Sequence, residues 1–274
     1  MNSTNVPKPS TRTQGVTSRL LDEIQGRGRL VTSLNELVAM SGLTPLAVRR
    51  QLEHLVDRIT RLPSRPSCFL IIPPEHRLRG APPIVNWLGD YCQLSQQPYY
   101  VGLLSAAAMH GSAQQAVQIT QVITTTPTRA LDLGNVHIEF HVKQRLDDTP
   151  LTQIKGLAAP LAVSSPEATA LDLMSFQQSV GGVARAVDVV AGLLPAMTAD
   201  GWRRALHLEN VAVKQRMGYV LEVLGAKKYA KLVEASLPAK LRQVRLQSAT
   251  PSLGAGWQMP WLVEDNIHLK ESMN

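Results

Sequence analysis

Basic side chains concentrated in the first third of the chain are its clearest chemical signal. Residues 1–80 contain 12 lysines and arginines against 6 aspartates and glutamates, which accounts for +6 of the net charge of +7. Cationic side chains bind phosphate oxygens, and each phosphate that they neutralise releases condensed counterions. A charge excess on one short segment is therefore typical of proteins that bind a nucleic-acid backbone. The candidate DNA contacts are Thr44, Arg49, Arg50, His54, Arg58, Arg61, Arg65, Arg77 and Arg79.

Two helices are expected before the segment in which these candidate contacts are most closely spaced. Apolar side chains recur at helical spacing over 16–25 and again over 34–40. The second helix opens with Ser33 and Glu36, three residues apart, which is the spacing of a capping box. Gly42 follows it and permits the left-handed backbone that a tight turn requires.

A third helix is expected to carry the basic face. Thr44 can cap its start, and Pro45 suits its first position. Helical spacing predicts that Arg50 and His54 point away from its apolar stripe, with Arg49 on the flank. The residues predicted to be buried along this helix are Val48, Leu52, Leu55, Val56 and Ile59.

A hairpin is predicted next, because two strand-like runs, 58–62 and 68–72, are separated by the turn-forming segment 63–67. A helix-turn-helix followed by such a hairpin, the wing, fits a major groove. Thr44, Arg49, Arg50 and His54 would then grip the groove, while Arg58, Arg61 and Arg65 would contact phosphates. Arg77 and Arg79 lead into Pro82-Pro83, where this domain is expected to end. The alternative is a small helical bundle whose arginines are only solvated.

The rest of the chain reads as a mixed domain. Helices are expected over 84–94, over 99–110 with Gly111 at the end, over 165–176, and from Gly181-Gly182 to about Leu237 with breaks near Pro195 and Gly225; strands are expected over 117–126, 136–142 and 157–163. The expected fold class is α+β, a winged helix-turn-helix plus a C-terminal mixed domain with a small sheet and then a helical region. The expected divisions are a flexible N-terminus (1–15), a DNA-binding domain (16–80), a C-terminal domain (81–245) and a tail (246–274).

Motifs for catalysis are sparse. No glycine-rich phosphate loop or Gly-x-Ser-x-Gly elbow is present in the sequence. His137, Glu139 and His141 share one face of a strand, as metal ligands can, but a solvent-facing strand gives the same pattern. A nuclease of the Glu-x-Lys type would need a carboxylate where His141 precedes Lys143. We therefore expect no enzyme activity, no cofactor and no metal.

Composition also bears on compartment. Residues 1–15 are polar and do not resemble a secretion signal, and no apolar window approaches the roughly 18 residues of a membrane span. Cys68 and Cys92 do not make a disulfide framework. The expectation is a cytoplasmic protein that does not enter a membrane.

Two longer motifs resemble the AbiEi antitoxins. They are residues 99–111, Tyr-Tyr-Val-Gly-Leu-Leu-Ser-Ala-Ala-Ala-Met-His-Gly, and residues 163–173, Val-Ser-Ser-Pro-Glu-Ala-Thr-Ala-Leu-Asp-Leu, followed by Gly181-Gly182; Phe69 to Pro74 also fits. The resemblance covers roughly residues 16–225. It implies a winged helix that represses its own promoter and an antitoxin domain, encoded beside a nucleotidyltransferase-like toxin in two-gene systems of phage abortive infection. It also suggests Tyr99, Tyr100 and His110 as participants in antitoxin function, although packing explains the same motifs.

A second basic zone lies in residues 211–245. Its eight basic residues are Lys214, Arg216, Lys227, Lys228, Lys231, Lys240, Arg242 and Arg245. Such a run is expected on a solvated helix face, and it would equally suit contact with flanking DNA, an acidic surface or RNA.

The sequence therefore predicts a DNA-binding autorepressor and antitoxin. Its expected partners are double-stranded DNA of its own promoter, bound at inverted repeats as a monomer or dimer, and the cognate nucleotidyltransferase toxin, engaged directly or indirectly. A ligand-responsive repressor with a C-terminal effector-binding domain is the alternative, and a nuclease-like enzyme is the third possibility.

Overall fold

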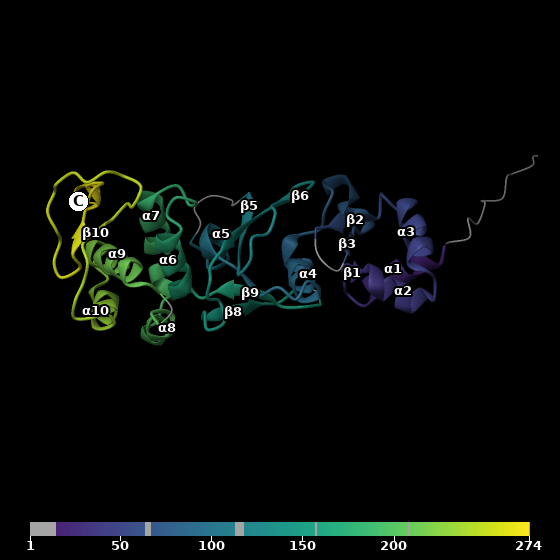
Figure 1. Ribbon diagram of the computed structural model, residues 1–274, viewed down its shortest axis with the longest axis horizontal. Coiled ribbons are helices and arrows are strands. Elements are labelled where there is room, and N and C mark those ends of the chain that lie inside the picture. Colours follow the sequence, from purple (N-terminus) through teal and green to yellow (C-terminus); the bar gives the residue numbers. More distant parts are fainter. Residues whose placement is uncertain (1–14, 64–66, 113–117, 157, 208, 274) are drawn as a thin grey trace, which may run out of the picture.

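The computed structural model of the chain describes residues 15–63, 67–112, 118–156, 158–207 and 209–273. The molecule is elongated, with a helical unit at each end and a six-stranded sheet between them (Figure 1). The fold mixes helices and sheets, as the sequence predicts. Within the described ranges no helix is both long enough and apolar enough to cross a membrane.

The N-terminal unit combines three helices with a three-stranded antiparallel sheet. Its elements are α1 (Val16–Gly26), β1 (Val31–Ser33), α2 (Leu34–Ser41), α3 (Pro45–Glu53), β2 (Ile59–Leu62) and β3 (Cys68–Ile71), with strand order β1-β3-β2. The Ser33 hydroxyl accepts the Glu36 amide hydrogen at the start of α2, and the Thr44 hydroxyl accepts that of Ala47 at the start of α3. Gly42 between them is left-handed, at φ 68°. These capping predictions are confirmed.

The third helix is shorter than expected. It ends at Glu53, the side chain of Val56 is 75% exposed, and Ile59 is the first residue of β2. The predicted burial of Val56 is therefore wrong. The apolar residues after Glu53 fit a helical spacing, but β-branched residues such as Ile59 and Thr60 favour a strand once a partner strand is available.

Both faces of the hairpin β2–β3 are covered. Ile59 and Ile71 pack with α1 to α3, whereas Leu62, Cys68 and Leu70 belong to a core shared with Trp87 and Tyr91. The Tyr91 hydroxyl also donates to the Pro63 carbonyl at 2.7 Å. Packing therefore continues past Pro82-Pro83, and the division at residue 80 stays a prediction.

The connection to the sheet begins with two short turns of 3-10 helix, Pro74–Arg79 and Ile84–Asn86, and then α4 (Leu88–Leu94). The helix predicted over 84–94 is thus interrupted at Trp87. Trp87 is fully buried, and its indole donates to the Pro82 carbonyl at 3.1 Å. This buried indole fixes the chain as it leaves the N-terminal unit.

The central sheet has the order β6-β7-β5-β4-β9-β8. Its strands are β4 (Tyr99–Val101), β5 (Ile119–Thr124), β6 (Leu131–Leu133), β7 (Val136–Val142), β8 (Leu151–Ile154) and β9 (Leu161–Ser164). Pairs β5–β7 and β4–β9 are parallel and the other pairs are antiparallel. The strand predicted over 136–142 is confirmed. Of the ranges predicted as strands, residue 117 and residue 157 lie outside the described residues.

The helix predicted over 99–110 is wrong in its first turn. Tyr99–Val101 form β4, and α5 spans only Leu103–Met109. Aromatic and β-branched residues favour a strand here. Gly102 lies between the two elements. A larger residue would not fit there, because a Cβ would lie 2.8 Å from Cγ1 of Ile123.

The C-terminal unit is helical. Its helices are α6 (Pro166–Ser175), α7 (Val183–Leu193), a 3-10 turn (Leu194–Ala196), α8 (Ala199–Ala205), α9 (Val211–Val223) and α10 (Lys227–Ala235). Ser165 caps α6 through the Ala168 amide, as the Ser-Pro-Glu motif predicts. Tyr100 and Ile123 of the sheet join this unit's core, while Val101 and Val122 join the core on the opposite side.

The described part of the expected tail is folded onto this unit. Strands β10 (Val244–Arg245) and β11 (Val263–Glu264) pair in parallel, and a short helix, α11 (Leu269–Ser272), follows. Trp261 is 2% exposed and packs on α9, where a Cβ at Gly218 would collide with its indole. Leu246, Trp261, Val263 and Leu269 of this segment therefore belong to the C-terminal core, whereas residues 251–257 are exposed.

Candidate nucleic-acid interface

Helix α3 presents one exposed face and one buried face. Val48 and Leu52 hold it in the core, and the Gln51 side chain accepts the Thr17 amide hydrogen at 3.0 Å, which ties α3 to α1. The residues left exposed along α3 and its cap are Thr44, Pro45, Leu46, Arg49, Arg50, Glu53 and His54. The predicted groove contacts Thr44, Arg49, Arg50 and His54 all lie on this surface. Leu46, with 59% of its side chain exposed, was not expected there.

The hairpin places a third arginine beside this helix. Arg61 is exposed and lies directly opposite Phe69 in the β2–β3 register. Side chains two residues apart share a face of a strand. Arg61, Phe69 and Ser67 therefore share the face that turns toward α3.

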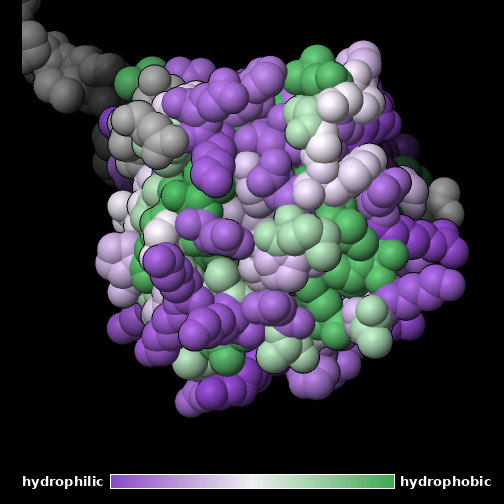
Figure 2. Space-filling view, turned by 90° about the vertical axis from the view of Figure 1, so that its left-hand side faces the viewer, coloured by the Kyte–Doolittle hydropathy of each residue, from purple (hydrophilic) through white to green (hydrophobic). Residues whose placement is uncertain are grey.

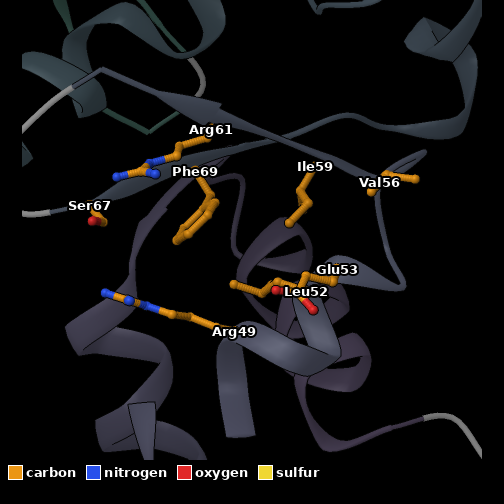
Figure 3. A pocket seen from close by; sticks show the side chains of 8 residues that line it. All are labelled: Arg49, Leu52, Glu53, Val56, Ile59, Arg61, Ser67 and Phe69. Carbon is orange, nitrogen blue, oxygen red and sulfur yellow. The ribbon is translucent and has the colours of Figure 1, made fainter. Parts of the chain in front are cut away.

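A cleft of about 340 Å³ separates α3 from the hairpin. It is lined by Arg49, Leu52, Glu53, Val56, Ile59, Arg61, Ser67 and Phe69 (Figure 3). Neither Arg49 nor Arg61 forms an ion pair within the described part of the chain. Both guanidinium groups are thus available to an anionic ligand.

Arg58 has a different environment from the other predicted contacts. Its guanidinium donates to the Ser18 hydroxyl at 2.7 Å and forms an ion pair with Asp22, and its side chain is only 15% exposed. Because both partners belong to α1, Arg58 braces the hairpin against the helices. The expected role of Arg58 as a phosphate contact stays a prediction, and these internal bonds do not favour it.

The remaining basic residues of this unit lie beside or beyond the cleft. Arg77 and Arg79 are exposed on the 3-10 turn Pro74–Arg79, with Arg77 3.6 Å from the Asp57 carboxylate. The Arg79 carbonyl accepts the Asn135 amide hydrogen at 3.1 Å, which joins this turn to the central sheet. Arg65 lies outside the described residues.

The three residues suggested for antitoxin function all make internal hydrogen bonds. The Tyr100 hydroxyl donates to Asp172 at 2.9 Å and the ring is fully buried. The Tyr99 hydroxyl accepts the Ala162 amide hydrogen at 3.4 Å, and Nε2 of His110 lies 2.7 Å from the Ser164 carbonyl. These residues therefore connect the sheet to its neighbours.

A buried charge network surrounds Tyr100. Lys143 donates to Asp172 at 2.7 Å and also to Glu209, so it joins the end of β7 to α6 and to the segment before α9. Burial lowers the pKa of Lys143, but Asp172 and Glu209 together outweigh that effect and raise it above its usual value. No sequence motif indicates this network, because its members lie far apart along the chain.

The candidate metal ligands on β7 differ in their surroundings, since His137 is hydrogen-bonded to Asp132 whereas the buried Nε2 of His141 has no hydrogen-bond partner among the described residues. Nδ1 of His137 lies 2.7 Å from Asp132, and Nε2 of His141 lies 3.8 Å from Glu139. In the portion of the chain that the structure describes, no group of three or more His, Cys, Asp or Glu side chains could hold a metal ion.

The second basic zone lies at the opposite end of the molecule. Arg216 donates to the Arg245 carbonyl at 2.8 Å, and Arg245 donates to the Thr250 carbonyl at 2.8 Å. Lys227, Lys228, Lys231, Lys240 and Arg242 are exposed. Hydrophilic side chains cover much of this end, with apolar groups among them (Figure 2). Arg216 and Arg245 thus organise loops, Lys214 is half-buried and the other five face solvent.

The comparison with protein families finds a match in the central sheet and the helices that follow it. Residues 100–223 match the model of the AbiEi antitoxin C-terminal domain. This part of the chain is therefore similar to that domain, and the resemblance seen in the sequence is confirmed. The matched range covers β4 to α9.

Solved structures add a likeness of fold. The RV2827C protein from Mycobacterium tuberculosis aligns with a TM-score of 0.58 at 16% identity, over 94% of each chain. An antigenic nucleotidyltransferase-like protein from Paracoccidioides brasiliensis aligns with a TM-score of 0.36 at 11% identity, over 56% of this chain and 91% of that one. No curated protein matches the chain in sequence. The first comparison shows a shared fold over nearly the whole length.

Proposed function

We propose that the protein is a DNA-binding autorepressor and antitoxin, and that residues 16–80 form a winged helix-turn-helix. The observation that carries the DNA-binding part is the common orientation of α3 and the hairpin. Arg49 and Arg50 on α3 and Arg61 on β2 are exposed, and none of the three has an ion-pair partner among the described residues. Unpaired arginines on adjoining elements suit the phosphates on either side of a groove.

In this proposal α3 enters the major groove. The first turn of a recognition helix contacts base edges, and here that turn carries Thr44 and Leu46. An exposed leucine has no favourable contact in water, but it can pack against the methyl group of thymine. The exposed Arg50 would donate to a guanine edge, and His54 lies at the far end of the same surface.

The hairpin would contact the DNA backbone. Arg61 provides the phosphate contact that the structure supports, and Arg65 extends the proposal to the turn. Arg77 and Arg79 are exposed near the sheet and would reach flanking phosphates. Arg58 is left out, because its pair with Asp22 and Ser18 occupies its guanidinium.

The antitoxin part of the proposal rests on the family domain over 100–223. A nucleotidyltransferase-like toxin encoded in the same operon is the proposed partner, in a cytoplasmic phage-defence system. Because Tyr100 is buried, a direct contact with the toxin would use other residues, and an indirect effect on the toxin's target is equally consistent. Repression would use inverted repeats, bound by a dimer or by two monomers.

The promoter test separates this proposal from a structural role for the basic unit. A reporter driven by DNA upstream of the gene should be repressed by the full chain. Repression should be lost with Arg49→Gln/Arg61→Gln and kept with Arg27→Gln, a control on the exposed end of α1, where Arg27 pairs with Glu23. Equal reporter activity with and without the unmodified chain would refute autorepression.

A ligand-responsive repressor is favoured by one observation in the C-terminal half. A cavity of about 630 Å³ lies between β8, the start of α6 and α8, and Glu167, Arg204 and His207 are among its lining residues. A ligand that binds only the native state raises the melting temperature. A rise in the melting temperature on addition of a metabolite, abolished by Arg204→Ala, would support this alternative.

A further inference from the structure

The cleft between α3 and the hairpin is chemically polarised. Arg49, Arg61 and Ser67 gather at one end (Figure 3). Glu53 and Val56 lie toward the other end, with the Phe69 ring and Ile59 between the two groups. A cationic end, an apolar middle and an acidic end are thus arranged along one cavity of about 340 Å³, a size within the range of small-molecule sites.

Backbone regularity fixes this order. Arg49 and Glu53 are one helical turn apart on α3, so they occupy the same face at successive heights. Arg61 and Phe69 are directly opposed in the antiparallel register, and Ser67 is two residues from Phe69 on the same strand face. The position of each group therefore follows from α3, which Thr44 caps, and from the pairing of β2 with β3.

The charges of the cleft are not neutralised from within. Arg49 and Arg61 have no carboxylate partner in the described ranges, and Glu53, although it lines the same cavity, has no ion-pair partner there. Two guanidinium groups on facing walls of the cleft, with the Ser67 hydroxyl at the same end, are suited to the oxygens of a phosphate (Figure 3). An exposed carboxylate at the opposite end is suited to an amino group.

The apolar middle sets the shape of the ligand. The Phe69 side chain is only half-buried, although it packs on the core that Ile59 and Leu52 belong to. An aromatic ring that remains partly exposed between cationic and acidic groups offers a stacking face for a flat ring. A phosphate alone would leave this face and Glu53 unused.

We propose that this cleft binds a single nucleotide unit, with its phosphate at Arg49, Arg61 and Ser67, its base against Phe69 and an exocyclic amino group of the base toward Glu53. Adenine and cytosine carry such an amino group, whereas hypoxanthine and uracil present a carbonyl at the equivalent position. The unit can come from a free mononucleotide or from an unpaired nucleotide of a strand. In either case it occupies part of the proposed DNA-binding face, so its effect on repression rests on the proposed function.

The test for a free nucleotide is calorimetric titration of the full chain with four compounds: AMP, its amino-lacking analogue IMP, the phosphate-lacking adenosine, and inorganic phosphate. AMP should bind at least about tenfold more tightly than the other three, since IMP lacks the amino group, adenosine lacks the phosphate and inorganic phosphate lacks the whole base. Glu53→Gln should make the affinities for AMP and IMP equal, and Arg61→Gln should make the affinities for AMP and adenosine equal. The matched control is Arg50→Gln, an exposed arginine of α3 outside the cleft, which should leave AMP binding unchanged.

A second arm tests the strand source. A duplex with one unpaired 3′ adenosine should bind more tightly than its blunt counterpart, and Glu53→Gln should remove the difference. AMP selectivity without overhang preference identifies a free nucleotide as the ligand, and the reverse result identifies a strand end. The proposal is overturned if neither appears, or if Arg50→Gln reduces AMP binding as much as Arg61→Gln. AMP binding by a chain that binds no blunt duplex would instead refute the DNA-binding function and leave this inference standing.

Discussion

Arg58 and Asp22 form an ion pair across 36 positions of sequence, which joins the segment before β2 to α1. The same guanidinium donates to Ser18, one turn earlier on α1. An arginine in a basic segment is ordinarily counted as a phosphate contact, but here both terminal nitrogens donate to partners inside the fold. This pair therefore separates the arginines that hold the N-terminal unit together from those that remain free to bind.

The first prediction follows from that separation. Arg58→Ala should lower the free energy of unfolding by about 1–3 kcal/mol, since a largely buried charge-assisted hydrogen bond to Ser18 is lost. Chemical denaturation of the full chain measures this. Arg61→Ala, at an exposed position, should leave unfolding within about 0.5 kcal/mol of the unmodified chain. Equal destabilisation by both substitutions would contradict the assigned roles.

Substitution of the exposed arginines should change DNA affinity and leave the stability of the fold nearly unchanged. Arg50→Ala is expected to weaken binding to the upstream DNA by about 1–3 kcal/mol and to relax base preference at one position, whereas Arg61→Ala should weaken all sequences alike and lower the salt slope by about 1. Fluorescence anisotropy at several salt concentrations measures both. Unchanged affinity in Arg50→Ala would remove Arg50 from the interface.

The buried network at Lys143 should be critical for folding. Lys143→Met leaves the fully buried Asp172 without its cation, and loss of one partner of a buried pair costs about 3–5 kcal/mol. Tyr100→Phe removes only a hydrogen bond to the same carboxylate and should cost about 1–3 kcal/mol. Thermal or denaturant unfolding measures which of the two variants loses more unfolding free energy. A larger loss in Tyr100→Phe would show that the lysine is not the main partner.

The C-terminal residues should be required for stability, although they lie beyond the matched family range. Trp261→Ala is expected to cost about 3–5 kcal/mol, as is typical of large-to-small changes in a core. Trp257→Ala, a partly exposed tryptophan on the neighbouring loop, serves as the control and should change stability little. If both variants unfold like the unmodified chain, residues 246–273 do not belong to the core.

Acid should weaken the N-terminal unit through Glu36. Burial raises the pKa of Glu36, but hydrogen bonds from Arg29 and Thr32 and the charge of Arg29 lower it below the ordinary 4.5. A carboxylate whose pKa is lower in the folded state adds stability above the unfolded pKa, and this stability is lost as pH falls through the folded pKa. Melting curves from neutrality to about pH 3 should therefore show a smaller acid loss in Glu36→Gln than in the unmodified chain. Parallel curves would contradict the role of this group.

Local signals in the sequence predicted the elements that depend on local chemistry. Ser33, Thr44 and Ser165 are caps because their hydroxyls accept amide hydrogens three residues later, a relationship visible in the sequence. The predicted end of α3 is wrong because the spacing of the apolar residues after Glu53 fits a helix as well as a strand. Tyr99–Val101 was mistaken for helix because its strand pairing depends on β5 and β9, far along the chain.

The candidate site was predicted only in part. Exposed basic residues of α3 could be identified from helical spacing, but the cleft requires the β2–β3 register and the turn of the hairpin toward α3. Glu53, Ser67 and Phe69 belong to it for that reason, and no single motif contains them. Arg58 shows the converse, since its partners on α1 cannot be inferred from spacing.

Binding of the full chain to the DNA upstream of its gene, titrated with salt against a scrambled duplex of equal length, tests the central claim most directly. We expect tighter binding to the upstream DNA, with an affinity that falls steeply as salt rises and with loss of the preference in Arg49→Gln/Arg50→Gln. Equal and weak binding to both duplexes would contradict the assignment of α3 and the hairpin as a sequence-specific DNA-binding surface.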